Sequence, residues 1–258
     1  MADDRKPSAG KTIVMIHGAF AGPWCFDRFR PVFEQRGWTC DAVTLPAHGG
    51  APDDTSRLAV LGVADYRLAL AAHLRSFADP LVLLGHSMGA VLAQQLAASG
   101  LARAMILASP APRFGILPFT DGEKQAAREM MGLGPFWTTA IHPSFEIAAA
   151  NSLNCIPPSM RQSIFDRFGS ESGRALFELF FWMFDSGAAT ALDVDQIRCP
   201  VMCFSGTEDR LISLATARAT ANGLQQAYFW EATGHGHMLL LEPQAERLAE
   251  RIVDWIPT

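Results

Sequence analysis

Short apolar runs alternate along the chain with segments of helical spacing. Residues 12–17, 39–45, 81–84, 104–108, 201–206 and 226–230 have the length and apolar character of buried strands. Helical spacing follows at about 24–33, 58–78, 214–222 and 243–255, and the end of the stretch 80–98 is rich in alanine and leucine. Strand followed by helix predicts an α/β fold, with a mostly parallel sheet and helices on both faces.

The alternation stops at Pro110 and resumes at Pro200. The residues between are helical in pieces, are broken by glycine and proline, and contain ten of the 17 phenylalanines. Inserted after the fourth predicted strand, they are most simply a helical cap over the carboxyl edge of the sheet, where open α/β sheets bind ligands. We therefore expect a flexible N-terminus over 1–11, a core domain over 12–109 and 199–258, and a cap over 110–198.

Composition narrows the possible partners. The chain has 258 residues and a formal net charge of −5, with no cluster of lysine or arginine, so we expect no nucleic-acid partner. No run approaches the roughly 18 apolar residues of a membrane span, and the polar start lacks the apolar core of a signal peptide. We therefore expect no membrane partner either. Oligomeric state is left open between a monomer and a homodimer.

The five cysteines have no metal-type spacing, and Cys199 and Cys203 fall on one face of a predicted strand. This pattern predicts buried thiols in a reducing, cytoplasmic compartment rather than metal ligands. The glycine-rich stretches match neither a phosphate-binding loop nor a dinucleotide fingerprint. We expect no metal and no cofactor.

The main chemical signal is Gly85-x-Ser87-x-Gly89, which lies between an apolar run and a helical segment. A strand that turns straight into a helix bends sharply, and glycine two residues on either side of the serine avoids a collision there. Such a turn leaves the serine hydroxyl clear of the sheet edge, at the positive end of the helix. The plain alternative is a helix with a serine N-cap, which needs no flanking glycines.

A serine nucleophile at neutral pH needs an imidazole that is oriented by a carboxylate. Candidates for both groups follow later strands. Glu208 and Asp209 come after the run 201–206, and His235 and His237 come after the run 226–230. Serine, then acid, then histidine is the chain order of the α/β-hydrolase arrangement.

Four motifs carry a family resemblance: His-Gly-x at 17–19, G-x-S-x-G at 85–89, G-x-x-D at 206–209 and G-H-x-x-x-x-E at 236–242. Together they resemble the α/β-hydrolase-fold serine hydrolases of the lid-bearing esterase and lipase type. The opening at 17–24 is most similar to the plant methylesterase and hydroxynitrile-lyase branch and its bacterial relatives. The similarity spans residues 12–256, although the cap is matched only in length and helical character.

The resemblance implies a role for each candidate. Ser87 is the nucleophile, Asp209 the acid and His237 the base, because the family pattern places the base directly before the apolar run that ends in glutamate. Glu208 is then expected as an exposed turn carboxylate, and His235 as a loop residue at the rim of the pocket.

The resemblance further implies that the backbone N–H groups of Ala19 and Met88 form the oxyanion hole. The other histidines are expected to be structural. His17 is predicted to hydrogen-bond the backbone and His86 to pack beside the nucleophile, whereas the sequence offers no partner for the remaining three, His48, His73 and His142.

Departures from the family subtypes narrow the reaction. Ser87 excludes the branches that use an aspartate nucleophile, and Gly18 and Met238 replace the threonine and lysine of hydroxynitrile lyases. The sequence therefore predicts a carboxylesterase for small to medium esters with an apolar acyl or alcohol part. Phe20, Trp137 and Trp182 are the candidate substrate contacts.

Two alternatives stay open beside the esterase. Within the fold, similar triads support C–C bond hydrolysis, perhydrolysis and cofactor-free oxygenation. The fold also serves as a non-catalytic small-molecule receptor, a role that an intact triad disfavours. Fold alone does not decide among these functions.

Overall fold

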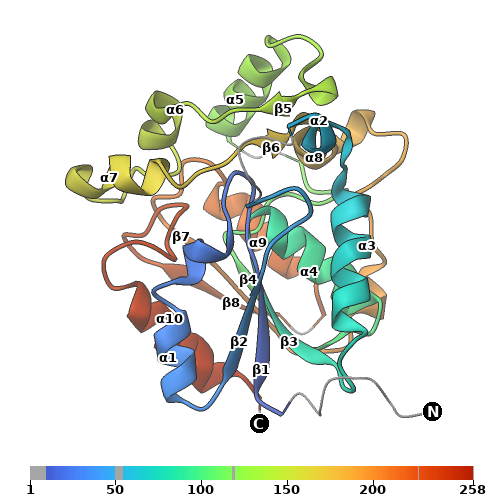
Figure 1. The fold of residues 1–258 in the computed structure, drawn as a ribbon, viewed down its shortest axis with the longest axis vertical. Helices are drawn as coiled ribbons and strands as arrows, with labels where there is room; N and C mark the ends of the chain where they lie inside the picture. The colour runs from blue at the N-terminus through green and yellow to red at the C-terminus, as the bar shows by residue number, and fades with distance from the viewer. Residues whose placement is uncertain (1–9, 50–54, 118–119, 226, 258) are drawn as a thin grey trace.

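A six-stranded parallel sheet lies at the centre of the computed structural model, which describes residues 10–49, 55–117, 120–225 and 227–257 (Figure 1). The strand order is β2-β1-β3-β4-β7-β8. The strands are β1 (Thr12–Ile16), β2 (Thr39–Val43), β3 (Leu81–His86), β4 (Ala102–Ala108), β7 (Val201–Gly206) and β8 (Ala227–Ala232). The predicted α/β class with a mostly parallel sheet is confirmed.

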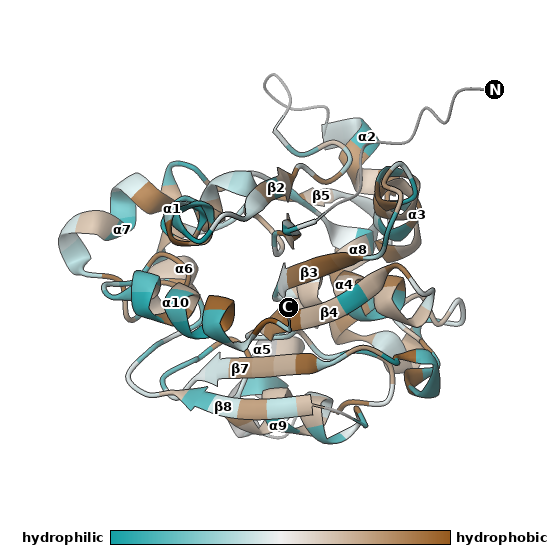
Figure 2. Cartoon of the chain, turned by 90° about the horizontal axis from the view of Figure 1, so that it is seen from below, coloured by the Kyte–Doolittle hydropathy of each residue, from teal (hydrophilic) through white to brown (hydrophobic). Residues whose placement is uncertain are grey.

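Alternating side chains of the strands supply two cores, one on each face of the sheet. On β1, Ile13 and Met15 pack with α1 (Arg30–Gln35) and α10 (Ala245–Trp255), whereas Val14 and Ile16 pack on the other face. That second face is covered by α3 (Val63–Leu74) and α4 (Met88–Ala98), with α9 (Leu214–Asn222) at its β8 end. Figure 2 shows brown, apolar strands between these helix layers.

The elements between β4 and β7 lie above the carboxyl ends of the strands in Figure 1. Their helices are α5 (Asp121–Met131), α6 (Phe145–Ala150), α7 (Pro158–Phe165) and α8 (Gly173–Phe180), with 3-10 turns at Phe136–Thr138, Trp182–Phe184 and Val194–Gln196. The segment is not wholly helical, because β5 (Ala140–Ile141) and β6 (Glu171–Ser172) pair antiparallel within it. We call residues 110–198 the cap.

Two helices predicted as continuous are broken in the structure. The helix expected over about 58–78 is divided into α2 (Thr55–Val60), which contacts the cap, and α3, which packs on the sheet. The break lies at Gly62, where a β-carbon would come within 2.7 Å of the Glu178 carboxylate from the cap. Similarly, 24–33 forms a 3-10 turn at Pro23–Phe26 and then α1, which begins with Pro31 near its start.

Other predicted bounds agree with the structure to within a few residues. The strand at 201–206 and the helix at 214–222 have the bounds that the sequence predicts. Cys199 and Cys203 are buried free thiols, as expected. Residues 1–9 of the expected flexible N-terminus, and Gln226, where the last strand was expected to start, lie outside the described residues.

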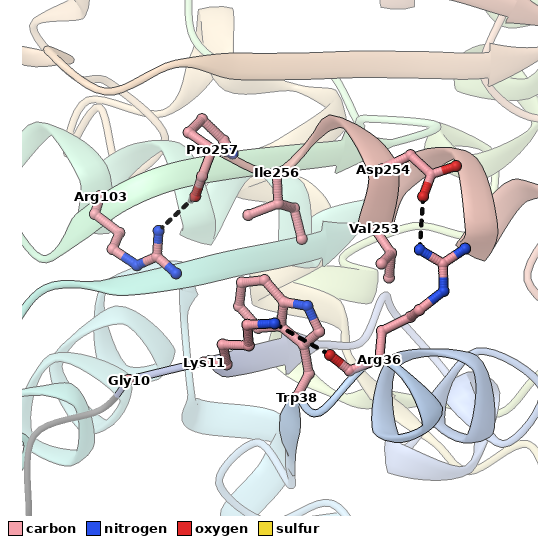
Figure 3. A pocket seen from close by; sticks show the side chains of 9 residues that line it. All are labelled: Gly10, Lys11, Arg36, Trp38, Arg103, Val253, Asp254, Ile256 and Pro257. Carbon is pink, nitrogen blue, oxygen red and sulfur yellow. Dashed lines mark hydrogen bonds and ion pairs between the residues drawn. The ribbon is translucent and has the colours of Figure 1, made fainter.

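A hollow of about 440 Å³ lies at the amino end of the sheet, opposite the cap (Figure 3). Gly10 and Lys11 line it beside Ile256 and Pro257, and Trp38 forms part of its wall. The charged groups around it are already partnered, since Arg36 pairs with Asp254 at 2.8 Å and Arg103 donates to the Pro257 carbonyl.

A membrane span needs a helix that is both long and apolar, and none of the helices of the described residues has both properties.

Candidate active site

Ser87 lies at the turn between β3 and α4 with a φ of 52° and a ψ of −117°. A positive φ is unfavourable for a residue with a side chain, so neighbouring groups must hold it. The Ser87 N–H donates to the Ala108 carbonyl at 3.0 Å, and the Ser87 carbonyl accepts from Ala90 and Ala111. This is the strained turn that the G-x-S-x-G motif predicts.

The two glycines of the motif permit a close approach between backbones. A β-carbon on Gly85 would lie 2.3 Å from the Gly89 carbonyl oxygen, and one on Gly89 would lie 2.1 Å from the Ile16 carbonyl oxygen. Neither position therefore accommodates a side chain. Ser87 itself is only 6% exposed rather than clear of its surroundings, because the cap lies over this edge of the sheet.

His237 and Asp209 form a hydrogen-bonded pair at the same edge. His237 Nδ1 lies 2.9 Å from Asp209 Oδ2, and both side chains are buried. The other carboxylate oxygen, Oδ1, accepts from the backbone N–H groups of Leu211 and Ile212 at 2.9 and 2.8 Å. The carboxylate is therefore oriented by its own loop, and it leaves His237 Nε2 as the free ring nitrogen for proton transfer.

The neighbouring candidates have other partners. Glu208 is exposed, as expected for a turn carboxylate. His235 Nδ1 lies 2.8 Å from Glu242 Oε2, and Glu242 Oε1 accepts from the Gly236 N–H at 2.9 Å. His235 lines a hollow with Gln244 and other residues around α10 rather than a pocket with Ser87, so the expectation that it forms the pocket rim is not supported by its contacts. The contact of His235 with Glu242 instead stabilises the loop that carries His237.

His86 connects the serine turn to the histidine loop. Its Nε2 donates to the His237 carbonyl at 2.9 Å, and the two rings lie 4.9 Å apart. Burial, with a smaller contribution from the nearby His237, lowers the pKa of His86 to about 3, so this imidazole is neutral and carries its proton on Nε2. His86 thus does more than pack beside the nucleophile: it holds the backbone of His237 next to Ser87.

The loop after β1 runs beside the serine. A β-carbon on Gly18 would come within 2.9 Å of Ser87 Cβ, which places the Gly18–Ala19 peptide against the serine turn. The Gly18 carbonyl accepts from His17 Nδ1 at 2.9 Å, while His17 Nε2 accepts from the Leu45 N–H at 3.2 Å. Burial, with a smaller contribution from His48, lowers the pKa of His17 to about 4, so this histidine is a neutral structural residue, as predicted.

Met88 is the first residue of α4. The N–H groups of a first helical turn have no acceptor within the helix, so the Met88 N–H is available to an oxyanion. Ala19, in the loop after β1, and Met88, at the start of α4, therefore belong to two different segments at the serine turn. The contacts of Gly18 with Ser87, of His86 with His237 and of His237 with Asp209 join the segments that carry five residues selected from the sequence, namely Ser87, Asp209, His237, Ala19 and Met88.

Residues 13–251 match the alpha/beta hydrolase family. The chain belongs to this family. A pyrethroid hydrolase of Sphingobium wenxiniae is 35% identical over 77 residues, which are 30% of this chain and 27% of that protein. Methylesterase 9 of Arabidopsis thaliana is 31% identical over 83 residues, 31% of this chain and 32% of that protein. These alignments thus cover about a third or less of the curated relatives.

Similarity to solved structures extends over almost the whole alpha/beta hydrolase chain. An extracellular alpha/beta-hydrolase from a Paenibacillus species, described as sharing structural and functional homology with tobacco salicylic acid binding protein 2, superposes with a TM-score of 0.72. The superposition covers 94% of this chain and 98% of that one at 17% identity. At this identity the likeness establishes the fold.

The three predicted substrate contacts of this hydrolase occupy different places. Phe20 packs with Ala19 against a buried cap cluster of Phe136, Leu176 and Phe181. Trp137 contacts Phe136 and is 37% exposed. Trp182 lies outside that cluster, and its Nε1 donates to the Ile116 carbonyl at 3.0 Å. Their contact with a substrate stays a prediction.

Sequence reasoning missed the partners of three histidines. His48 Nε2 lies 3.0 Å from Glu171, His73 Nε2 lies 2.7 Å from Asp41, and the His142 ring hydrogen-bonds Ser170. The contact between His48 and Glu171 joins residues that are 123 positions apart, and it depends on how the cap is placed relative to the core. No spacing pattern encodes such a contact. Among the described residues, no group of three or more His, Cys, Asp or Glu side chains is arranged to hold a metal ion.

Proposed function

We propose that this alpha/beta hydrolase cleaves carboxylic esters through a Ser87–His237–Asp209 triad and an acyl-enzyme intermediate. The observation that carries the proposal is the buried His237–Asp209 pair next to the positive-φ serine turn. A serine held on such a turn, with an imidazole oriented by a carboxylate, is the arrangement that activates a hydroxyl for acyl transfer.

The proposed mechanism assigns one group to each step. His237 Nε2 takes the proton of Ser87 as its Oγ attacks the ester carbonyl, and the N–H groups of Ala19 and Met88 stabilise the oxyanion. The protonated His237 then gives its proton to the leaving alcohol. Water, deprotonated by the same imidazole, attacks the acyl-enzyme and regenerates Ser87.

An apolar substrate part is supported by the surroundings of the first loop. Ala19 and Phe20 pack against the cap cluster of Phe136, Leu176 and Phe181, so apolar cap residues adjoin the proposed oxyanion hole. The relatives named pyrethroid hydrolase and methylesterase are consistent with esters of this kind. The five free thiols favour a reducing compartment such as the cytoplasm, although the Paenibacillus neighbour is described as extracellular.

The test is turnover of p-nitrophenyl esters of increasing acyl length by the wild type, Ser87→Ala and His237→Ala. Both variants are expected to lose about 10³-fold or more in kcat/KM, and the chain-length optimum measures the acyl site. His73→Ala is the matched control, because His73 also pairs with a carboxylate, Asp41, at 2.7 Å but lies elsewhere. It should retain activity.

Two outcomes would contradict the ester proposal. A wild type without ester turnover that is still labelled at Ser87 by a fluorophosphonate would indicate C–C hydrolysis or oxygenase chemistry on the same triad. A wild type that shows neither turnover nor labelling would leave the receptor function.

A further inference from the structure

Glu171 of the cap strand β6 is a carboxylate with no exposed surface. Its Oε1 accepts from the Tyr66 hydroxyl at 2.8 Å and from the Ser172 N–H at 2.7 Å. Its Oε2 lies 3.0 Å from His48 Nε2 and accepts from the Phe20 N–H at 3.4 Å. A buried charge persists only when its lone pairs are satisfied, and here four donors from four segments of the chain meet one carboxylate.

The charges of this cluster are set by the same contacts. Both ring nitrogens of His48 face acceptors, Pro46 O at 3.0 Å and Glu171 Oε2, so the ring satisfies both only as an imidazolium. Burial lowers the pKa of His48, but the hydrogen bond and charge of Glu171, together with backbone hydrogen bonds at Pro46 and Leu45, raise it on balance. Burial likewise opposes the ionisation of Glu171, and the hydrogen bonds from His48, Tyr66 and Ser172 outweigh it and lower its pKa. Cap and core therefore meet through an ion pair.

The other groups around the pair are neutral. The His17 ring lies 5.2 Å from His48, and the pKa of His17 is lowered to about 4 by burial. The pKa of the Tyr66 hydroxyl is raised by burial and by Glu171, so it remains a donor. The negative charge of Glu171 is thus directed at His48 and at the Phe20 N–H.

Phe20 is the residue that follows the proposed oxyanion donor Ala19. Its φ is +62°, a conformation that a phenylalanine adopts only when its surroundings impose it. The cap holds the residue on both sides, because Glu171 accepts from its N–H and the Gly169 N–H donates to its carbonyl at 2.9 Å. On the other side of Ala19, the core holds the Gly18 carbonyl through His17.

We propose that Glu171 is a positioning residue of the oxyanion hole: from the cap it fixes the Phe20 peptide, so that the N–H of Ala19 points at the substrate carbonyl oxygen. The inference rests on the proposed function. It follows that a correctly seated cap completes the catalytic loop of the core, in addition to covering the substrate.

The test compares Glu171→Gln with Glu178→Gln. A glutamine at 171 replaces one acceptor oxygen by an N–H₂ group that faces donors. Glu178 in α8 is the matched control, since it is also a buried cap carboxylate that accepts from a core N–H at 2.7 Å. That N–H belongs to Val63 in α3 and not to the loop that carries the proposed oxyanion donor Ala19. Five quantities are measured: the thermal midpoint, the fraction of Ser87 titrated by a fluorophosphonate, kcat per titrated site, KM, and the Ki of a trifluoromethyl ketone.

Glu171→Gln is expected to lower kcat about tenfold or more per titrated site, with KM changed less than about twofold. The Ki of the trifluoromethyl ketone should rise by a similar factor, because its hemiketal oxyanion uses the same donors. Glu178→Gln should lower the thermal midpoint and leave kcat and Ki as in the wild type. A Glu171→Gln protein that is less stable but has wild-type kcat and Ki per site would overturn the inference.

His48→Gln provides a second variant in case Glu171→Gln does not fold. This variant removes the His48 cation and leaves the Glu171 carboxylate. It should therefore lower kcat and raise Ki, each by a smaller factor than Glu171→Gln does. Unchanged values of kcat and Ki would count against the inference. Failure of the proposed function can be distinguished from failure of this inference, because the wild type itself would then show no ester turnover. In that case the inference would fail together with the proposed function.

Discussion

His237 Nδ1 lies 2.9 Å from Asp209 Oδ2, although the two residues belong to different loops, 28 positions apart. The loops meet because Gly206 has no side chain: a β-carbon there would lie 2.0 Å from the His235 carbonyl oxygen. The Glu208 N–H also donates to this carbonyl at 2.9 Å. Acid and histidine are therefore held by backbone contacts on both sides.

Asp209→Asn should lower kcat about 10⁴-fold, because an amide no longer stabilises the imidazolium and favours the wrong tautomer of His237. Glu208→Gln is the matched control, since Glu208 is adjacent and exposed, and it should stay within about twofold of the wild type. Steady-state turnover of p-nitrophenyl butyrate checks both variants. An equal loss in the two would mean that Glu208 shares the role of the acid.

Glu242→Gln should weaken the loop that carries His237. Glu242 is 2% exposed and holds both the Gly236 N–H and His235 Nδ1, so the variant leaves one buried donor unsatisfied. We expect a loss of about 1–3 kcal/mol in the free energy of unfolding, measured with urea, together with a lower kcat. Glu246→Gln, which weakens a half-buried pair with Arg28, should cost less than Glu242→Gln, about 1 kcal/mol. Equal losses would contradict this prediction.

Gly18→Ala should disturb the nucleophile directly. The new β-carbon would meet Ser87 Cβ at 2.9 Å and His86 Nδ1 at 3.1 Å, and the serine turn is too constrained to move away. The second-order rate of fluorophosphonate labelling at Ser87 is expected to fall about tenfold or more. Gly169→Ala adds its methyl group to open space and should label at the wild-type rate. A normal rate for Gly18→Ala would show that this loop is adaptable.

Stability should depend on pH through His48 and Glu171. Burial lowers the pKa of His48, but Glu171 and the backbone hydrogen bonds at Pro46 and Leu45 together raise it above its ordinary value of 6.5. The stability that His48 contributes to the folded state is therefore complete below pH 6.5 and is lost as pH rises through the folded pKa. The folded pKa of Glu171 lies below its ordinary value of 4.5. The stability that its charge contributes to the folded state is therefore complete above pH 4.5 and is lost as pH falls through the folded pKa.

Urea unfolding of the wild type and His48→Gln from pH 5 to pH 9 measures this dependence. The difference in unfolding free energy should be largest near pH 5–6.5 and should shrink toward pH 9. His17 faces His48, but its pKa is lowered to about 4, mainly by burial that the variant keeps, so His17 is expected to stay neutral over this pH range. A difference that does not vary with pH would show that the pair is not ionised.

The sequence alone is sufficient to predict the strands of the sheet and the candidate residues at its carboxyl edge. Apolar runs locate the strands, and Ser87, Asp209 and His237 each follow a strand, so parallel pairing alone brings them to one edge. The helix over 58–78 was predicted wrongly as continuous because its break at Gly62 depends on Glu178, which lies far along the chain in the cap. Local periodicity contains no information about such a contact.

The same reason explains the residues that sequence reasoning missed. His48 seemed to lack a partner because Glu171 is 123 residues away, in a cap whose sequence indicates helices but not their placement. Two-residue strands such as β5 and β6 are too short to produce an alternating pattern. Motifs therefore identified the reacting groups, whereas the groups that position them became apparent only from the three-dimensional contacts.

Residues near both ends of the described chain meet far from the proposed chemistry. Gly10 and Pro257 line one hollow at the amino end of the sheet, and the cap lies at the opposite end (Figures 1 and 3). A surface tether or a fusion partner joined near either residue would therefore leave the cap facing solution. Immobilised on a support in this way, the enzyme would present its cap outward, whether it was attached near Gly10 or near Pro257.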